Sequence, residues 1–232
     1  MLLLILFTVT IFHRKEVFII STTELLVQQM QTEMDNKNIM LYCGQFCVSL
    51  CSRIQDIDTC MSATEGRPVI DHTMWRIKSA ESIVKKLQRK GRDISLETAM
   101  ETLHDIMGIR IICPFQDDVF HVTEAVKSMD NLEIINIKNF ISHPKRSGYR
   151  SIHIICRADV PGIGKSFLEI QLRSVAMNYW AILDHLLCYK NENKKVQNLR
   201  KELKKCALEI ADIDKRFYRL RKRIEKLSDQ DT

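Results

Sequence analysis

The chain has 232 residues, of which 45% are hydrophobic and 28% are charged, and it carries a formal net charge of +6 at pH 7. This is the composition of a globular protein, which excludes a disordered chain and a chain embedded in a membrane. The length is sufficient for one well-buried domain with extensions, or for two small domains.

Residues 1–21 are predicted to form an apolar N-terminal extension. The apolar run ends at residue 12, which is too short for a bilayer span of roughly 20 apolar residues. Arg14 and Lys15 follow this run, whereas the charges of a signal peptide precede it. We therefore expect an extension rather than a membrane anchor, and we expect no membrane partner.

The eight cysteines favour a reducing compartment. Cys43, Cys47 and Cys51 recur every four residues, which places them on one face of a helix, and Cys113 and Cys156 lie in apolar runs. Cysteine in such positions acts as a small apolar residue, so we predict a cytoplasmic protein without disulfides. A metal site at Cys43 and Cys47 is the weaker interpretation, because the chain has no second pair at a suitable spacing.

The apolar spacing predicts helices and strands that interleave along the chain. Residues 22–69 form the N-terminal helices, over 22–35 and 38–60, before a loop marked by Gly66 and Pro68. Further helices are expected over 79–89, 95–103, 117–129 and 174–189, and strands over 109–113, 132–137, 151–157 and 167–172. The fold class is therefore α+β, with a mixed β-sheet of about five strands flanked by helices.

Residues 191–232 are predicted to form a basic C-terminal helix. Residues 194–226 contain 13 Lys and Arg against 5 Asp and Glu, while the remainder of the chain contains 22 against 24. Apolar residues recur in steps of three and four as in a heptad seam: Val196, Leu199, Leu203, Cys206, Ile210, Ile213, Phe217, Leu220, Ile224 and Leu227. The pattern is satisfied equally by a helix folded against its own domain and by a subunit interface.

The segment Lys145–His153 has the residue types of a nucleotide site. Gly148 permits close approach of the backbone to a ligand, the cations around it match phosphates, and Tyr149 offers a ring for stacking on a base. Ser151 and His153 share a strand face; His153 either reaches a phosphate or is a satisfied core histidine.

Two further groups of residues support this interpretation. Lys78, Ser82 and Lys86 are four residues apart, which on one helix face would hold a polyphosphate, although a solvated basic face has the same pattern. Asp105 precedes a glycine turn into a strand, and Glu169 alternates with buried residues on another strand. At about 4 Å, two such carboxylates would repel each other by roughly 4 kcal/mol at an intermediate dielectric. Mg²⁺ between them would remove that repulsion, so we predict a magnesium site.

The segments that carry these residues resemble the synthetase domain of RelA/SpoT homologues. They are Arg76–Ser82, Asp105–Arg110, Lys145–His153, Glu169–Arg173 and Ala176–Ala181. The resemblance covers residues 70–190, and the short chain is similar to the small alarmone synthetases. It implies a nucleotidyltransferase-like synthetase domain that transfers pyrophosphate from ATP to the 3′-hydroxyl of GDP or GTP, giving guanosine tetra- or pentaphosphate and AMP.

The resemblance also implies roles for individual residues. Glu169 and Gln171 would be catalytic, orienting or deprotonating the 3′-hydroxyl, and Asp105 and Glu169 would bind Mg²⁺. The remaining family positions would bind ATP (Arg76, Lys78, Ser82, Lys86, Arg110 and Lys145) or the guanine nucleotide (Tyr149, His153, Arg173 and Asn178). Small relatives are often tetramers, so the resemblance implies a homo-oligomer, with the C-terminal helix as a suitable interface.

The chain departs from the family pattern at Asp184, where many relatives have Glu before the histidine. Long relatives also carry a hydrolase domain; His104 and Asp105 form an HD pair, but too few residues precede them to build that domain, and we expect no alarmone hydrolysis.

Two other functions compete with synthesis. Gly164-Lys165-Ser166 ends like a P-loop, but Asp159 stands where that motif requires its first glycine. A non-enzymatic module that binds nucleotide or RNA through the basic C-terminal helix would leave Asp105, Glu169 and Tyr149 without a purpose.

Overall fold

The computed structural model describes residues 21–188 and 194–228. In chain order, its first half contains α1 (Thr22–Asn36), α2 (Ile39–Glu65), β1 (His72–Ile77), α3 (Ala80–Arg89), α4 (Leu96–Thr102), β2 (Met107–Cys113) and α5 (Gln116–Lys127). Its second half contains β3 (Glu133–Asn139), β4 (Ile152–Val160), β5 (Gly164–Ser174), α6 (Val175–Cys188) and α7 (Lys194–Ser228). Residues 1–20 of the predicted extension, and the ends of the predicted C-terminal segment, lie outside the described residues.

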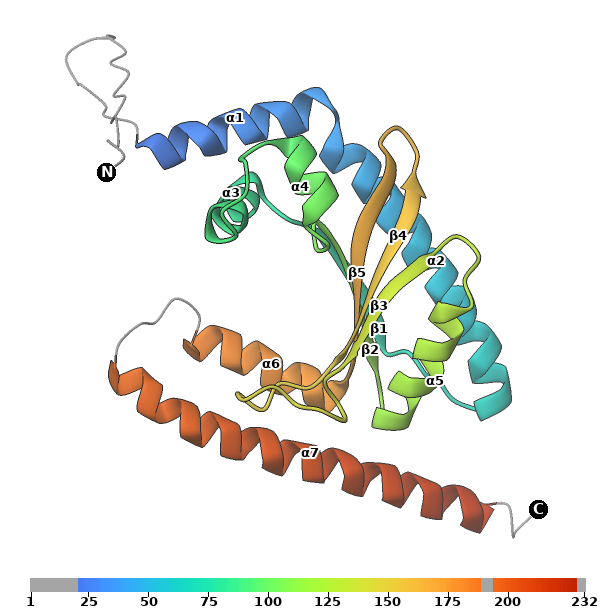
Figure 1. Ribbon diagram of the computed structural model, residues 1–232. Helices are drawn as coiled ribbons and strands as arrows, with labels where there is room; N and C mark the ends of the chain where they lie inside the picture. Colours follow the sequence, from blue (N-terminus) through green and yellow to red (C-terminus); the bar gives the residue numbers. More distant parts are fainter. Residues whose placement is uncertain (1–20, 189–193, 229–232) are drawn as a thin grey trace, which may run out of the picture.

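The strands form one mixed sheet in the order β1-β2-β5-β4-β3. Only β2 and β5 run parallel among the paired strands of the described residues, and the other three pairs are antiparallel. The prediction of an α+β fold with about five strands is therefore confirmed. In Figure 1, α2 and α5 lie on one side of the sheet, whereas α3 and α4 lie toward one end of the other side and α6 and α7 toward its opposite end.

The prediction that Lys78, Ser82 and Lys86 share one helix face was wrong. Arg76 lies on the edge strand β1, which the sequence pattern did not predict, and α3 begins only at Ala80. The reason is local: the Ser79 hydroxyl accepts a hydrogen bond from the backbone N–H of Ser82, which makes Ser79 the N-cap of α3. Lys78 therefore lies outside the helix, and Lys78, Ser82 and Lys86 do not share one helix face.

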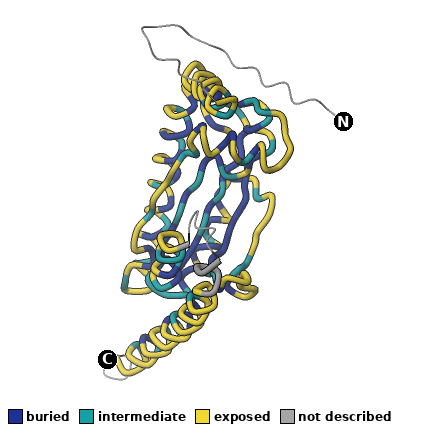
Figure 2. Tube along the Cα trace, turned by 90° about the vertical axis from the view of Figure 1, so that its left-hand side faces the viewer, coloured by how far each residue is buried: buried dark blue, intermediate teal, exposed yellow. Residues whose placement is uncertain are grey.

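A single hydrophobic core joins the N-terminal helices to the sheet. Cys43 and Cys47 are fully buried in it, as their spacing predicted, and burial raises the pKa of Cys47 to about 12. The same core contains Leu168, Ile170 and Leu172 of β5. Figure 2 shows the buried residues gathered along the strands and the exposed residues along the outer helices. The division of the chain at residues 69 and 190 stays a prediction.

The long helix α7 packs against its own domain, but not through the predicted seam. Ala207, Ala211 and Asp214 are buried on its inner side, and Trp180 Nε1 of α6 donates a hydrogen bond to the carbonyl of Leu203. The seam residues beyond Ile210 are exposed: Ile213, Phe217, Leu220, Ile224 and Leu227. No helix among residues 21–188 and 194–228 has the length and apolar character needed to cross a membrane.

Candidate active site

The register of the sheet aligns polar side chains from four strands on the side opposite α2 and α5. Arg76 of β1 pairs with Gly108 of β2, which pairs with Glu169 of β5. In the next row Arg110 pairs with Gln171, and Gln171 pairs with His153 of β4. Alternate residues of a strand share one face, so these polar positions on β1, β2, β4 and β5 come together on one face of the sheet.

Glu169 lies at the centre of this group and is held through both carboxylate oxygens. Oε1 lies 2.8 Å from His153 Nδ1, and Oε2 accepts a hydrogen bond of 2.7 Å from Gln171 Nε2. Burial opposes ionisation, but the hydrogen bonds outweigh it and hold the pKa of Glu169 below its ordinary value. The carboxylate is therefore ionised and fixed in orientation at neutral pH.

The aromatic part of the site is joined to Glu169 through His153. Tyr149 Oη lies 2.7 Å from His153 Nε2, and Arg173 Nη2 donates to the same Oη at 2.8 Å. A guanidinium only donates, so the Tyr149 oxygen accepts from Arg173 and its own hydroxyl hydrogen is free to donate to His153 Nε2. A neutral His153 with its hydrogen on Nδ1 then donates to Glu169, and all four side chains have hydrogen-bond partners. The Lys145 ammonium lies 4.6 Å from the centroid of the Tyr149 ring. His153 is thus a satisfied, buried histidine that also orients two site residues.

Arg173 and Asn178 support the aromatic group through hydrogen bonds. Arg173 is only 5% exposed; besides Tyr149, it donates to Gln171 Oε1 at 2.9 Å and to Asn178 Oδ1 at 3.2 Å. Asn178 is itself buried on α6. These contacts make Asn178 a support for Arg173, and Arg173 a support for the Tyr149 ring.

Asp105 brings together two of the predicted lysines. Lys78 Nζ lies 3.0 Å from Oδ2 and Lys86 Nζ lies 2.6 Å from Oδ1. Burial opposes the charge of Asp105, but the two ammonium groups outweigh it and lower its pKa. Ser82 is exposed, and its hydroxyl lies 3.0 Å from that of Ser79. Lys78 and Lys86 therefore converge on the Asp105 carboxylate and are not aligned along one helix face.

Two cavities open on this side of the sheet. A small one of about 80 Å³ is lined by Asp105 and Glu169, together with Arg76, Arg110 and Gln171 among others. The negative charge of Asp105 acts to raise the pKa of Glu169, which is the mutual repulsion expected of a carboxylate pair. The predicted metal residues thus share one cavity.

The second cavity has a volume of about 990 Å³ and extends to α6 and α7. Tyr149, Gln171 and Arg173 line it from the sheet side, and Asp184 and His185 line it from α6. Four of its cations received no individual role from the sequence: Arg146, which lies within the predicted Lys145–His153 segment, and Arg200, Lys201 and Lys204. The helical spacing of the last three was a usable signal, but only if the position of α7 had been known.

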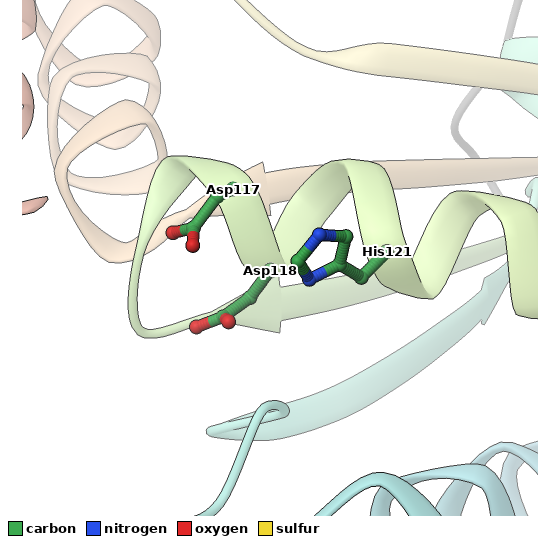
Figure 3. A group of neighbouring side chains, drawn as sticks. All are labelled: Asp117, Asp118 and His121. Carbon is green, nitrogen blue, oxygen red and sulfur yellow. The ribbon is translucent and has the colours of Figure 1, made fainter. Parts of the chain in front are cut away.

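A separate acidic group lies on α5, where Asp117, Asp118 and His121 place candidate ligand atoms within 4.8 Å of one another (Figure 3). Arg67 holds Asp118 through two hydrogen bonds of 2.9 and 2.7 Å, and Arg221 of α7 pairs with Asp117. Guanidinium groups therefore already neutralise these carboxylates. The group joins α7 to the domain and is not part of the cavity that contains Glu169.

Comparison with known proteins agrees with this geometry. Residues 75–194 match the family described as "Region found in RelA / SpoT proteins". Over 164 residues, covering 69% of this chain and 78% of the relative, the sequence is 40% identical to GTP pyrophosphokinase YwaC of Bacillus subtilis (strain 168). It is 28% identical to GTP pyrophosphokinase YjbM of the same organism over 177 residues, which is 75% of this chain and 82% of the relative.

The solved structures that this chain resembles belong to the same group of proteins. The crystal structure of small alarmone synthetase 1 from Bacillus subtilis bound to its product pppGpp has a TM-score of 0.72 at 28% identity, covering 82% of this chain and 98% of that one. Small alarmone synthetase 2 from the same organism has a TM-score of 0.69 at 34% identity, covering 82% and 99%. With the family match spanning more than half of the chain, the protein belongs to the RelA/SpoT family and has the fold of the small alarmone synthetases.

Proposed function

We propose that the protein is a GTP/GDP diphosphokinase that transfers pyrophosphate from ATP to the 3′-hydroxyl of GDP or GTP. The products are AMP and guanosine tetra- or pentaphosphate, the alarmone of the stringent response. The observation that carries the proposal is the chain of contacts from Tyr149 through His153 to Glu169, at the edge of cavities lined with cations. Relatives named GTP pyrophosphokinase, and a solved relative bound to pppGpp, support the same reaction.

The acceptor nucleotide would lie between Tyr149 and Glu169. Guanine would stack on the Tyr149 ring, and the ribose 3′-hydroxyl would face the Glu169 carboxylate. The 3′-oxygen forms a bond to the β-phosphorus of ATP while the bond from that phosphorus to the α-phosphate oxygen breaks, and AMP leaves. Glu169 accepts or orients the hydroxyl proton, with Gln171 fixing the carboxylate; a positioned base typically contributes about 10²–10⁴-fold.

ATP would occupy the side of the site formed by β1, β2 and α3. Lys78 and Lys86 would meet its phosphates beside Asp105, and Arg76 and Arg110 line the adjoining cavity. Ser82 of α3 is proposed to contact ATP on this side. Lys145, whose ammonium lies over the Tyr149 ring, is proposed to reach the ATP phosphates from the acceptor side. These cations act mainly by positioning the phosphates and stabilising charge, which is how proteins accelerate phosphoryl transfer.

Asp105 and Glu169 fit a magnesium site. Both are carboxylates, both line the small cavity, and the charge of Asp105 disfavours ionisation of Glu169, so a hard divalent cation would stabilise the pair. When bound, Mg²⁺ would neutralise charge on the transferred pyrophosphate. Lys78 and Lys86 would continue to balance the charge of Asp105.

The protein is further proposed to assemble into a homo-oligomer through α7, with a tetramer as the expected state. Phe217, Leu220 and Ile224 are exposed, and they line a cavity of about 600 Å³ together with Phe115. Such an apolar surface suits a second copy of the chain. A cytoplasmic location is also proposed, because the seven cysteines with described side chains are free thiols, as expected in a reducing compartment.

The deciding experiment is incubation of the protein with ATP, Mg²⁺ and either GDP or GTP, followed by nucleotide chromatography. We expect AMP together with an equal amount of guanosine tetra- or pentaphosphate, and loss of both peaks when EDTA removes the metal. The rival function, a non-enzymatic module that binds RNA through α7, predicts retention of RNA without either product. That outcome would contradict the proposal.

A further inference from the structure

We propose that the N-terminal half of α7 completes the acceptor site, and that Arg146, Arg200, Lys201 and Lys204 bind the 5′-phosphate chain of the guanine nucleotide. The inference rests on the proposed function, because it concerns the substrate of that same site. It gives α7 a role in substrate specificity, in addition to the oligomer interface proposed for its exposed apolar seam.

The four cations reach the large cavity from two separate segments. Arg146 comes from the loop before Tyr149, and the other three come from α7. Lys204 follows Arg200 by four residues and Lys201 by three, so all three lie on neighbouring positions of one helix face. The next position on that face is Ala207, which is buried against the domain. The three side chains line the cavity, although each also remains exposed to solvent.

A close contact fixes α7 beside the base-binding loop. Gly148 has a φ of +97°, and a Cβ added there would lie 2.4 Å from the Cβ of Ala207 and 3.8 Å from the Cα of Lys204. The loop can rest on α7 this closely only because both positions are small. Tyr149 and Lys204 are thus held in neighbouring positions on the wall of one cavity.

The charges around the large cavity are strongly unbalanced. Seven Lys or Arg residues line it, against a single carboxylate, Asp184, which interacts with Arg200. Arg146, Lys201 and Lys204 have no ion-pair partner among the described residues, whereas Lys78 and Lys86 share Asp105. Like charges in one concave site attract a polyanion and are stabilised by it. If the α7 cations formed only a solvated basic face, nothing would favour their sharing one cavity with Arg146 of a separate loop.

The stereochemistry of the acceptor selects its 5′-phosphates as that polyanion. With guanine on Tyr149 and the 3′-hydroxyl toward Glu169, the 5′-carbon leaves the other side of the ribose and points away from Glu169. The phosphates of ATP belong beside Asp105, in the other cavity. A longer 5′ chain reaches more of the α7 cations, so the site should favour GTP over GDP, and GDP over GMP.

The test is the double variant Lys201→Ala/Lys204→Ala, assayed with GTP, GDP and GMP as acceptors. We expect KM for GTP to rise roughly tenfold, as for the loss of charge-assisted hydrogen bonds, with a smaller rise for GDP and none for GMP. KM for ATP and kcat should stay within about twofold of the wild type. Lys205→Ala is the matched control, because Lys205 is exposed and pairs with Glu202 at 3.0 Å.

An equal change for all three acceptors, a change in KM for ATP, or no change would overturn the proposal. Calorimetric titration of wild type and double variant with GTP and GDP gives a second readout that needs no turnover. Preferential loss of GTP binding in the variant supports the phosphate site even if the wild type forms no alarmone, a result that would refute only the proposed reaction. Equal affinities of the two proteins for GTP would refute the phosphate site alone.

Discussion

Tyr149 and Glu169 contact the two nitrogens of the same imidazole. The hydroxyl of Tyr149 lies 2.7 Å from Nε2 of His153, and a carboxylate oxygen of Glu169 lies 2.8 Å from Nδ1. The ring proposed to stack on guanine and the carboxylate proposed to meet the 3′-hydroxyl are therefore held in one rigid unit. This arrangement fits catalysis by positioning, because base and nucleophile are oriented together.

Glu169→Gln should abolish synthesis without unfolding the protein. The amide has nearly the same shape, but it cannot accept the hydroxyl proton, so we expect turnover to fall by about 100-fold or more. Product formation by chromatography and the thermal unfolding midpoint are the measurements. Glu133→Gln on β3 is the control, because Glu133 is exposed. Near-normal turnover of the Glu169 variant would remove this residue from the mechanism.

Tyr149→Ala should weaken acceptor binding selectively. Loss of base stacking costs about 1–3 kcal/mol, which corresponds to a rise of roughly 5–150-fold in KM for GDP or GTP, with KM for ATP unchanged. Tyr149→Phe keeps the ring but releases His153, so it should lower kcat more than it raises KM. Steady-state kinetics separate the two effects. Tyr179→Ala, which removes an exposed aromatic side chain on α6, should be neutral; parallel losses in all three variants would count against stacking.

Gly148→Ala should destabilise the protein more than Gly164→Ala. Both glycines have a left-handed φ, +97° and +91°, so both variants carry a backbone cost of about 1–2 kcal/mol. Only at Gly148 would the new methyl group overlap Ala207, adding roughly 1–3 kcal/mol, whereas nothing lies within 4 Å at Gly164. Urea denaturation measures the difference. Equal free energies of unfolding for the two variants would show that the loop does not rest on α7.

Asp214→Asn should reduce the loss of stability that accompanies rising pH. Asp214 accepts a hydrogen bond of 2.6 Å from Ser174, whose hydroxyl also accepts from the backbone N–H of Met177 at the start of α6. Burial raises the pKa of Asp214, and the bond from Ser174 opposes only part of the rise. The folded protein therefore binds more protons than the unfolded chain above the ordinary value of 3.8, so the free energy of unfolding falls as pH rises through that window.

The Asn side chain can still accept from Ser174 but cannot ionise. The free energy of unfolding of the variant minus that of the wild type should thus be larger at pH 7 than at pH 4. Denaturation of both proteins at the two pH values measures this difference. Asp212→Asn on the exposed side of α7 is the matched control and should show no such trend. A constant difference between the Asp214 variant and the wild type would contradict the raised pKa.

Phe217→Glu with Ile224→Glu should lower the oligomeric mass. These side chains are 57% and 63% exposed, so the substitutions should leave the packing of α7 on its own domain intact. Deleting α7 is a poorer test, because Ala207, Asp214 and Arg221 pack on the domain. Light scattering gives the mass, circular dichroism checks folding, and Arg219→Glu, at an exposed position of α7, controls for the change in charge because it also lowers the net charge by two. An unchanged mass would place the subunit interface elsewhere.

Local sequence determined much of the fold and most of the site. The helices of the N-terminal half follow from apolar spacing and from caps such as Ser79 and Ser95, because these depend on residues three or four positions apart. The alternation that puts Glu169 and Gln171 on the open face of β5 is equally local. The motifs around Gly148 and Glu169 were sufficient to indicate a nucleotide site.

Tertiary structure alone decided the rest. The edge strand β1 lacks an alternating pattern, and it exists because its backbone pairs with β2. Lys78 and Lys86 meet only because both lie near Asp105. The small residues of α7 face inward because Gly148 and Trp180 contact that side of the helix, which leaves the heptad seam facing outward. Contacts between residues far apart in sequence depend on how surfaces fit in three dimensions, and a one-dimensional pattern of residue types does not record that fit.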